Sequence, residues 1–322
     1  MSRGLGDVYK RQAFFQAMRL DNLKCVQPIL DAAGLTEEQF VADLKQFDKL
    51  ELVDLRYDKA AKISDQSFSN YLIKYVFVDQ KVIPLSKMIE EGFFINQERT
   101  VVACNILLQV FSDEDVQKYV KEQIDIVWDS LKISKEKFVP FFKVFCLIRP
   151  TETLVLLSDF IESELARVFD VGTIKFEKNK SEKNIEDDAI KILCAFKATH
   201  QTSEAVELLL LYYQKRLDLF YEIYSALAIH FGVDIDSERR GYFVQEIVVE
   251  QLCKAIESNQ TTNLLLLFIR VAAQFLKLSF SRTEGGRHNS ITFYTVALAS
   301  QKTVLGYRKM LLQQLYKLYE QN

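Results

Sequence analysis

The sequence predicts a mostly α-helical protein in which a small domain with a two-stranded wing precedes an irregular array of helices. Ten glycines and four prolines among 322 residues are too few for a turn-rich all-β protein. Beyond residue 78, apolar residues recur at helical spacing between short polar joints, as in antiparallel helical hairpins. The hydrophobic fraction of 49% excludes a disordered chain, and the length suits about two domains.

The first twelve residues, MSRGLGDVYKRQ, differ in character from the rest. Residues 2–12 resemble, codon for codon, the translated end of a transposase sequencing adapter, so we exclude residues 1–12 from the fold as a non-native segment. Because this segment carries three basic residues and one acidic residue, its removal changes the formal charge from −3 to −5. We therefore expect the natural protein to extend upstream of Ala13.

Residues 13–78 form the first predicted domain. A short helix ends at Gly34, and Thr36 then begins a second helix with Gln39 three residues on, which is the pattern of a capping box. This second helix repeats its apolar residues along one face, as expected of a helix that packs on a core. The face consists of Phe40, Leu44 and Phe47.

The segment DLRYDKAAKISD, residues 54–65, predicts two short strands around a polar turn at Asp58 and Lys59. Ser64 or Asp65 then caps another helix. The apolar stripe of that helix consists of Phe68, Tyr71, Leu72 and Tyr75. Helices, a two-stranded wing and a further helix follow one another in the order of a winged helix, so we predict a winged-helix-like domain over residues 13–78.

The charge of this domain argues against sequence-specific DNA binding. The helix in the recognition position, residues 36–53, carries five acidic residues against the two lysines Lys45 and Lys49. Phosphate repulsion would oppose its entry into a groove. We therefore predict that the winged helix packs within a larger protein, and that nucleic acid is not a favoured partner.

Residues 79–322 are predicted to form an irregular α-helical array, since no fixed repeat period recurs. Its clearest polar break is the loop of residues 172–188, where we expect any division of the array. Residues 281–290 are predicted to be a loop, whereas residues 291–296 fit a strand and a buried helix equally well. The predicted helices are residues 85–94, 99–111, 113–131, 135–145, 151–168, 189–198, 202–215, 217–231, 241–258, 263–279 and 303–319.

The sequence contains no motif that carries catalysis. It has no P-loop, no G-x-S-x-G elbow and no C-x-x-C pair, and its three histidines lack metal-ligand spacing. We therefore predict no catalytic, cofactor-binding or metal-ligating residue. Five widely spaced cysteines, mostly in apolar runs, indicate free thiols and a reducing cytoplasm. The chain also lacks an uncharged apolar run long enough for a membrane span, so no membrane partner is expected.

One loop qualifies as a candidate binding site. Two glycines flanked by cationic side chains can form a small nest that binds an anion. An ordinary flexible turn explains the same residues and is the favoured interpretation. The residues of this candidate anion-binding loop are Arg282, Gly285, Gly286, Arg287 and His288.

Several segments resemble one protein family. The sequence KISDQSFSNYLIKYVFVDQKVIPLSKMIEEGF, residues 62–93, is similar to the segment just after the nucleotide-binding core of large bacterial STAND ATPases, the NACHT- and AAA-like signal-transduction NTPases. The runs FKATHQTSEAVELLLLYYQKR, from Phe196, and GYFVQEIVVEQL, from Gly241, are similar as well. The resemblance covers most of residues 13–322 and is most specific at the wing.

The resemblance implies a regulatory and sensing role rather than a catalytic one, in a family of which many members are thought to act in antiphage defence. It places the family's Walker motifs upstream of Ala13, so ATP and Mg²⁺ are expected only in that upstream core. The winged helix would pack on the core and help to hold the inactive state. The array would bind a protein, either a trigger or an adjoining subunit.

Two other interpretations stay open at the level of sequence. The first is a nucleic-acid-binding regulator, in which the wing reads DNA and the helices dimerise. The second is a helical protein-interaction scaffold that is complete in itself. The surface charge of the helix at residues 36–53 distinguishes the first from the STAND interpretation, and the genomic sequence upstream of Ala13 distinguishes the second.

Overall fold

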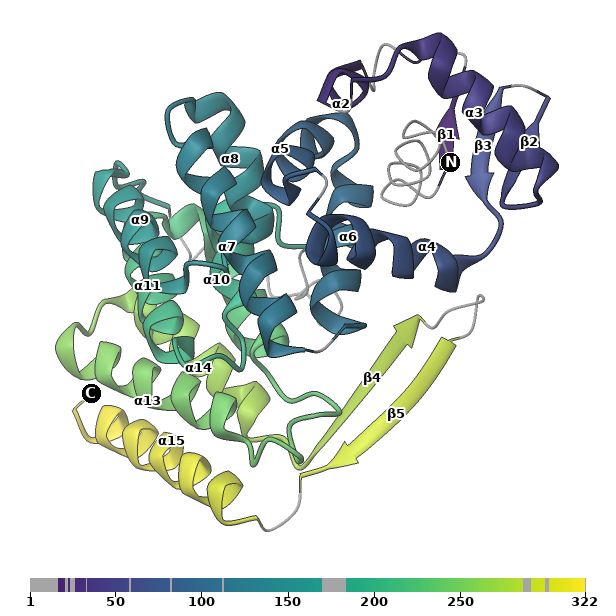
Figure 1. Cartoon of the computed structure of the whole chain (residues 1–322). Coiled ribbons are helices and arrows are strands. Elements are labelled where there is room, and N and C mark those ends of the chain that lie inside the picture. The colour runs from purple at the N-terminus through teal and green to yellow at the C-terminus, as the bar shows by residue number, and fades with distance from the viewer. Residues whose placement is uncertain are drawn as a thin grey trace. The chain divides into compact units, whose positions relative to one another are not determined.

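The computed structural model describes residues 17–20, 23, 27–32, 34–57, 59–81, 83–111, 113–169, 184–285, 291–298 and 301–321. These residues are mostly helical, as the sequence predicted (Figure 1). The chain separates into two compact units, Met1–Ile148 and Arg149–Asn322. The boundary that the sequence suggested after residue 78 therefore lies inside the first unit.

A three-stranded antiparallel sheet lies in the first unit. It consists of β1 (Ala17–Arg19), β2 (Val53–Arg56) and β3 (Ala60–Ile63), in the order β1-β3-β2. β2 and β3 are the two strands predicted around the turn at residues 58 and 59, with Val53 opposite Ile63. The third strand, β1, was not predicted, because three residues are too few to show a period of two.

The helices α2 (Gln27–Ala32) and α3 (Glu37–Lys49) connect β1 to β2. The predicted capping box is confirmed: Gln39 N–H donates to Thr36 Oγ1 at 3.2 Å, and Thr36 N–H donates to Gln39 Oε1 at 3.1 Å. The predicted apolar face is buried, and it consists of Phe40, Leu44 and Phe47.

Helix α4 (Gln66–Lys74) follows β3 and continues into a π-helical turn, η2 (Tyr75–Asp79). Asp65 is its N-cap, because Phe68 N–H donates to the carboxylate at 2.6 Å. The face that α4 and η2 bury contains Ser69, Ile73, Val76 and Phe77. Three members of the predicted apolar stripe, Phe68, Tyr71 and Tyr75, are instead exposed.

Four further helices complete the first unit: α5 (Leu85–Ile95), α6 (Gln97–Gln109), α7 (Glu114–Leu131) and α8 (Lys135–Phe145). Their observed bounds differ from the predicted ones by at most two residues. Aromatic side chains fill their core, where the Trp128 ring contacts Phe138 and Phe142 at centroid distances of 5.2 and 5.5 Å. Offset and edge-on packing of this kind stabilises beyond the area that it buries.

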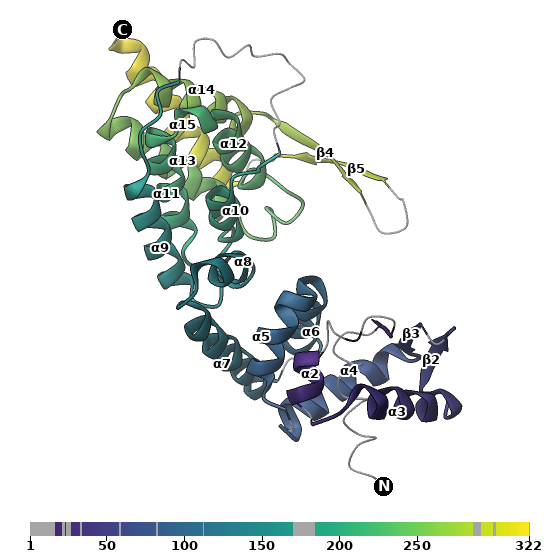
Figure 2. The ribbon, with the colours of Figure 1, turned by 90° about the horizontal axis from the view of Figure 1, so that it is seen from above.

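The second unit is built from two layers of helices. In the first layer, α9 (Pro150–Ser163), α11 (Thr202–Lys215), α13 (Phe243–Ser258) and α15 (Lys302–Glu320) pack one after another into a row (Figure 2). The second layer holds α10 (Asp188–Ala195), α12 (Phe220–Ser225) and α14 (Thr262–Phe275). The predicted loop of residues 172–188 lies outside the described residues up to residue 183.

Two predicted helices of this unit differ most from the observed ones. The helix expected at residues 151–168 ends at Ser163. The helix expected at residues 217–231 is divided into the 3₁₀ turn η4 (Leu217–Leu219), α12 and the π-helical turn η5 (Ala226–His230). In the second case, apolar periodicity cannot distinguish a 3₁₀ turn, an α-helix and a π-helical turn, because their side-chain patterns are nearly the same over a few residues.

A hairpin of β4 (Ser279–Gly285) and β5 (Ile291–Ala297) separates α14 from α15. Its register pairs Ser279 with Ala297 and Gly285 with Ile291. The prediction of a loop was therefore wrong for residues 281–285, because pairing with β5 supplies backbone partners that a local reading cannot foresee. The open choice at residues 291–296 is settled in favour of a strand.

Two further observations concern the described residues as a whole. None of their helices is long and apolar enough to cross a lipid bilayer. Four cysteines are free thiols, of which Cys104, Cys146 and Cys194 are buried. Burial raises the pKa of each buried thiol, to about 12 for Cys104, so these cysteines act as small core residues.

Candidate protein-interaction surface on helix α15

Helix α15 forms the end of the row and presents two distinct faces. Its inner face packs along α13, and it repeats at the spacing of an amphipathic helix. The buried residues of this face are Val304, Tyr307, Leu311, Gln314 and Leu318. Local sequence therefore fixes which side of α15 enters the core.

The outer face of α15 carries large apolar side chains that stay in contact with solvent. Leu305 is 53% exposed, Leu312 is 56% exposed, and Tyr316 and Tyr319 are 62% and 81% exposed. Leu305, Leu312 and Tyr319 follow one another at intervals of seven residues, which places them on one stripe of the helix. Isolated exposed leucines are ordinary, but an aligned set marks an interaction surface.

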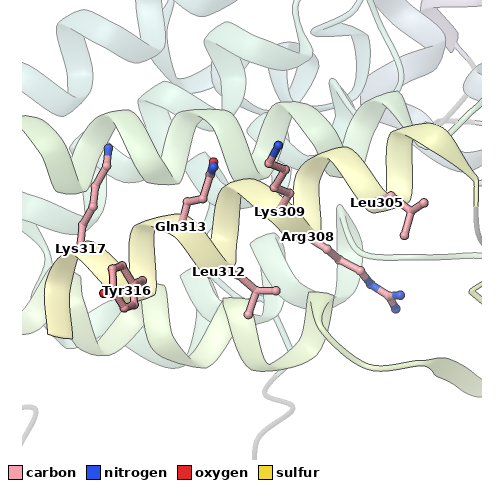
Figure 3. A pocket seen from close by; sticks show the side chains of 7 residues that line it. All are labelled: Leu305, Arg308, Lys309, Leu312, Gln313, Tyr316 and Lys317. Atoms are coloured by element: carbon pink, nitrogen blue, oxygen red, sulfur yellow. The ribbon is translucent and has the colours of Figure 1, made fainter. Parts of the chain in front are cut away.

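A shallow groove of about 880 Å³ runs along this face. Figure 3 shows that Lys309, Gln313 and Lys317 project to one side of the helix, whereas the other four lining residues, Leu305, Arg308, Leu312 and Tyr316, project to the other. The groove therefore has one polar side with two lysines, and one side on which Arg308 lies among large apolar side chains. The lining residues are Leu305, Arg308, Lys309, Leu312, Gln313, Tyr316 and Lys317.

Two of the three cations at the groove already have partners within the chain. Arg308 Nε donates to the carbonyl of Phe275 at 3.5 Å, and its Nη2 donates to the carbonyl of Lys277. Lys317 Nζ lies 3.1 Å from Glu257 Oε1 on α13. Lys309 is exposed and has no ion-pair partner within the part of the chain that the structure describes.

A second and more polar groove, of about 380 Å³, lies between α13 and α15. Its one thiol, Cys253, is protonated at neutral pH, because burial and the nearby Glu257 raise its pKa to about 11. A protonated thiol is a poor nucleophile. The lining residues are Glu250, Cys253, Lys254, Glu257, Met310, Gln313, Gln314 and Lys317.

Several titratable groups elsewhere in the second unit form contacts within the fold. Lys197 Nζ lies 2.7 Å from Asp234 Oδ2, and Arg240 contacts the same carboxylate at 3.3 Å. His230 Nε2 lies 2.9 Å from the carbonyl oxygen of Cys194, near the end of α10. This contact joins the His230 ring to the backbone of Cys194.

The candidate anion-binding loop is only partly described. Arg282 and Gly285 belong to β4, where they pair with Tyr294 and Ile291 of β5. Gly286, Arg287 and His288 lie outside the described residues. Over the described ranges, no group of three or more His, Cys, Asp or Glu side chains is placed to hold a metal ion.

Sequence reasoning found α15 as an amphipathic helix but did not identify its outer face as a surface of interest. The signal was present in the seven-residue interval from Leu305 to Leu312 to Tyr319. It could not be interpreted without the structure, because the same interval is typical of residues that face a core.

Comparison of the chain with family models, with curated proteins and with solved structures finds no match.

Proposed function

We propose that this chain is a non-catalytic regulatory and recognition module of a STAND-type signal-transduction NTPase. Its winged helix packs on the nucleotide-binding core, and its helical array binds a protein, which is a trigger or an adjoining subunit. The observation that carries the recognition role is the outer face of α15, where aligned apolar side chains lie exposed beside basic ones.

The order of elements in the first unit supports the winged-helix part of the proposal. β1 precedes two helices, and β2 and β3 then form an antiparallel wing on the same sheet, with the order β1-β3-β2. A winged helix has this combination of helices and wing.

The charge of α3 supports packing on protein rather than DNA. Glu37, Glu38 and Asp48 are exposed on α3, which occupies the recognition position. Since the acidic residues of this helix outnumber its two lysines, a phosphate backbone would repel it on balance. A complementary basic surface on a nucleotide-binding core would accept it more readily.

The proposal assigns no catalytic residue, metal or cofactor to this chain. ATP and Mg²⁺ belong to the nucleotide-binding core, and activation is a rearrangement of the regulatory parts that is coupled to the nucleotide state of that core. The buried free thiols Cys104, Cys146 and Cys194 fit a reducing compartment, so we place the protein in the cytoplasm, in a signalling pathway such as antiviral defence.

Three measurements test the proposal. Sequencing of the genomic locus with a different library chemistry should reveal a P-loop in the same reading frame. The purified chain should show no ATP turnover, and it should not shift a 30-bp DNA duplex at about 0.15 M salt, where non-specific affinity is weak. ATP hydrolysis by the chain itself, or tight duplex binding, would overturn the proposal.

A further inference from the structure

We propose that the outer face of α15 is the docking site for an acidic amphipathic helix of a partner protein. This inference rests on the proposed function, in which the array binds protein, and it names the chemistry of what is bound. It is carried by the position of α15 in the row, by the shape and composition of its outer face, and by the charge of that face.

The position of α15 indicates that a helix fits there. α11 packs against α9 and α13, and α13 packs against α11 and α15, whereas within the described residues α15 packs extensively on α13 alone. A further helix on the outer face would therefore extend the row by the contact that already joins each pair of neighbours. Helix-in-groove recognition of this kind uses apolar anchors spaced by three, four and seven residues.

The dimensions of the face also match a helix. Leu305 and Tyr319 bound the apolar stripe, and at 1.5 Å per residue the stripe is about 21 Å long. A partner helix of about 18 residues covers such a length. Leu305, Leu312 and Tyr316 line the groove, and side chains of a facing helix can insert between them.

The positive charge of α15 favours an acidic partner. α15 carries four basic residues against the single acid Glu320. Lys309 lies at the groove with no ion-pair partner among the described side chains, so a carboxylate of an incoming helix can pair with it without displacing an existing contact. A second copy of this chain would bring the same lysine instead of a carboxylate, so it lacks the complementary charge.

The same basic residues are too few to bind this face stably to an anionic membrane surface. Arg308 and Lys317 are already engaged with the carbonyl of Lys277 and with Glu257. Each lysine near an anionic bilayer contributes only about 1 kcal/mol, and stable binding usually needs a larger basic cluster. A protein helix, which adds apolar anchors to a few ion pairs, fits the observed residues better.

A designed peptide tests the proposal on the full chain. The probe is a fluorescein-labelled helix of about 18 residues with leucines at helical spacing and flanking glutamates, and its control replaces every glutamate by lysine. Fluorescence anisotropy measures both affinities. We expect the glutamate peptide to bind saturably, and about tenfold more tightly than the lysine peptide.

Variants locate the binding. Leu312→Asp should weaken the glutamate peptide about tenfold, whereas Leu165→Asp, at another exposed leucine, should leave its affinity unchanged. Lys309→Glu should weaken the glutamate peptide and strengthen the lysine peptide, whereas Lys121→Glu, at an exposed lysine of α7, makes the same charge change and should alter neither. Circular dichroism checks that each variant stays folded.

Several results would overturn the proposal. Equal affinity for the two peptides would contradict the role of charge, and full affinity in Leu312→Asp would contradict the location. Binding to vesicles of phosphatidylserine and phosphatidylcholine that Leu312→Asp abolishes would assign the face to membranes, and self-association that Leu312→Asp abolishes would assign it to a second copy. None of these results depends on ATP turnover or DNA binding, which test the proposed function separately.

Discussion

Asp234 holds a polar cluster together at the scale of single residues. Its side chain is 15% exposed and that of Lys197 is 16% exposed, and Lys197 Nζ lies 2.7 Å from Asp234 Oδ2. Ser237 Oγ donates to the same carboxylate at 2.8 Å. Burial alone would raise the pKa of Asp234, but the hydrogen bonds from Lys197 and Ser237 and the charges of Lys197 and Arg240 lower it to about 2.

This lowered pKa predicts a pH-dependent contribution to stability. The folded state binds the proton of Asp234 less tightly than the unfolded state, so its contribution of about 2 kcal/mol is present above pH ~4 and lost as the pH falls towards ~2. Asp234→Asn should therefore lower the free energy of unfolding by about 2 kcal/mol at pH 7, with a smaller deficit near pH ~2.5. Urea unfolding at both pH values measures the difference.

A surface ion pair provides the control for this prediction. Glu257 and Lys317 lie 3.1 Å apart, and their side chains are more than half exposed. Glu257→Gln should change the free energy of unfolding by less than about 0.5 kcal/mol at pH 7. Equal losses in the two variants would show that the burial of Asp234 does not matter.

Two glycines predict opposite effects of the same substitution. Gly34 follows α2 with φ of +62°, a conformation that disfavours any Cβ, whereas Gly306 lies inside α15 with open space around the point that a Cβ would occupy. Gly34→Ala should therefore destabilise by about 1 kcal/mol, and Gly306→Ala should stabilise by about 0.5–1 kcal/mol. Thermal unfolding should show a lower Tm for the first variant and a higher Tm for the second. A higher Tm for Gly34→Ala would contradict the left-handed conformation.

The two faces of α15 make a prediction at the scale of elements. Leu311 is fully buried against the core, and its neighbour Leu312 is 56% exposed. Leu311→Ala should lower the free energy of unfolding by about 3 kcal/mol, because it leaves a cavity, whereas Leu312→Ala should cost less than about 0.5 kcal/mol. Chemical denaturation of both variants measures the two costs. Similar costs would mean that α15 is rotated from its described position.

The elements also show where local sequence is decisive. The capping box of Thr36 and Gln39, the cap at Asp65 and the stop at Gly34 depend on residues within one turn of each other, so helix ends could be predicted there. β1 could not be predicted, because its partner β3 is distant in sequence. β4 was missed because its residues alone do not indicate a strand, and only pairing with β5 shows it. The π-helical turns η2 and η5 were missed because their side-chain pattern matches that of an α-helix.

At the scale of the whole molecule, two units make a prediction about cooperativity. Met1–Ile148 and Arg149–Asn322 each have a buried core of their own, so each is expected to fold without the other. Residues 149–322 expressed alone should retain their helical circular dichroism and unfold cooperatively, as should residues 13–148. A helical signal that disappears when the units are separated would contradict this expectation.

Local sequence was enough to establish the helical class, the helix boundaries in most of the chain and the two strands at residues 53–63, and it indicated free thiols, of which Cys104, Cys146 and Cys194 are buried. These features follow from apolar periodicity and from caps, which act over a few residues. Three other features emerged only from the packing of the folded chain: the division after Ile148, the strand at residues 281–285 and the exposure of Leu305 and Leu312. An apolar stripe looks the same in sequence whether a neighbour covers it or not, and it is the place of α15 at the end of its row that leaves this one exposed.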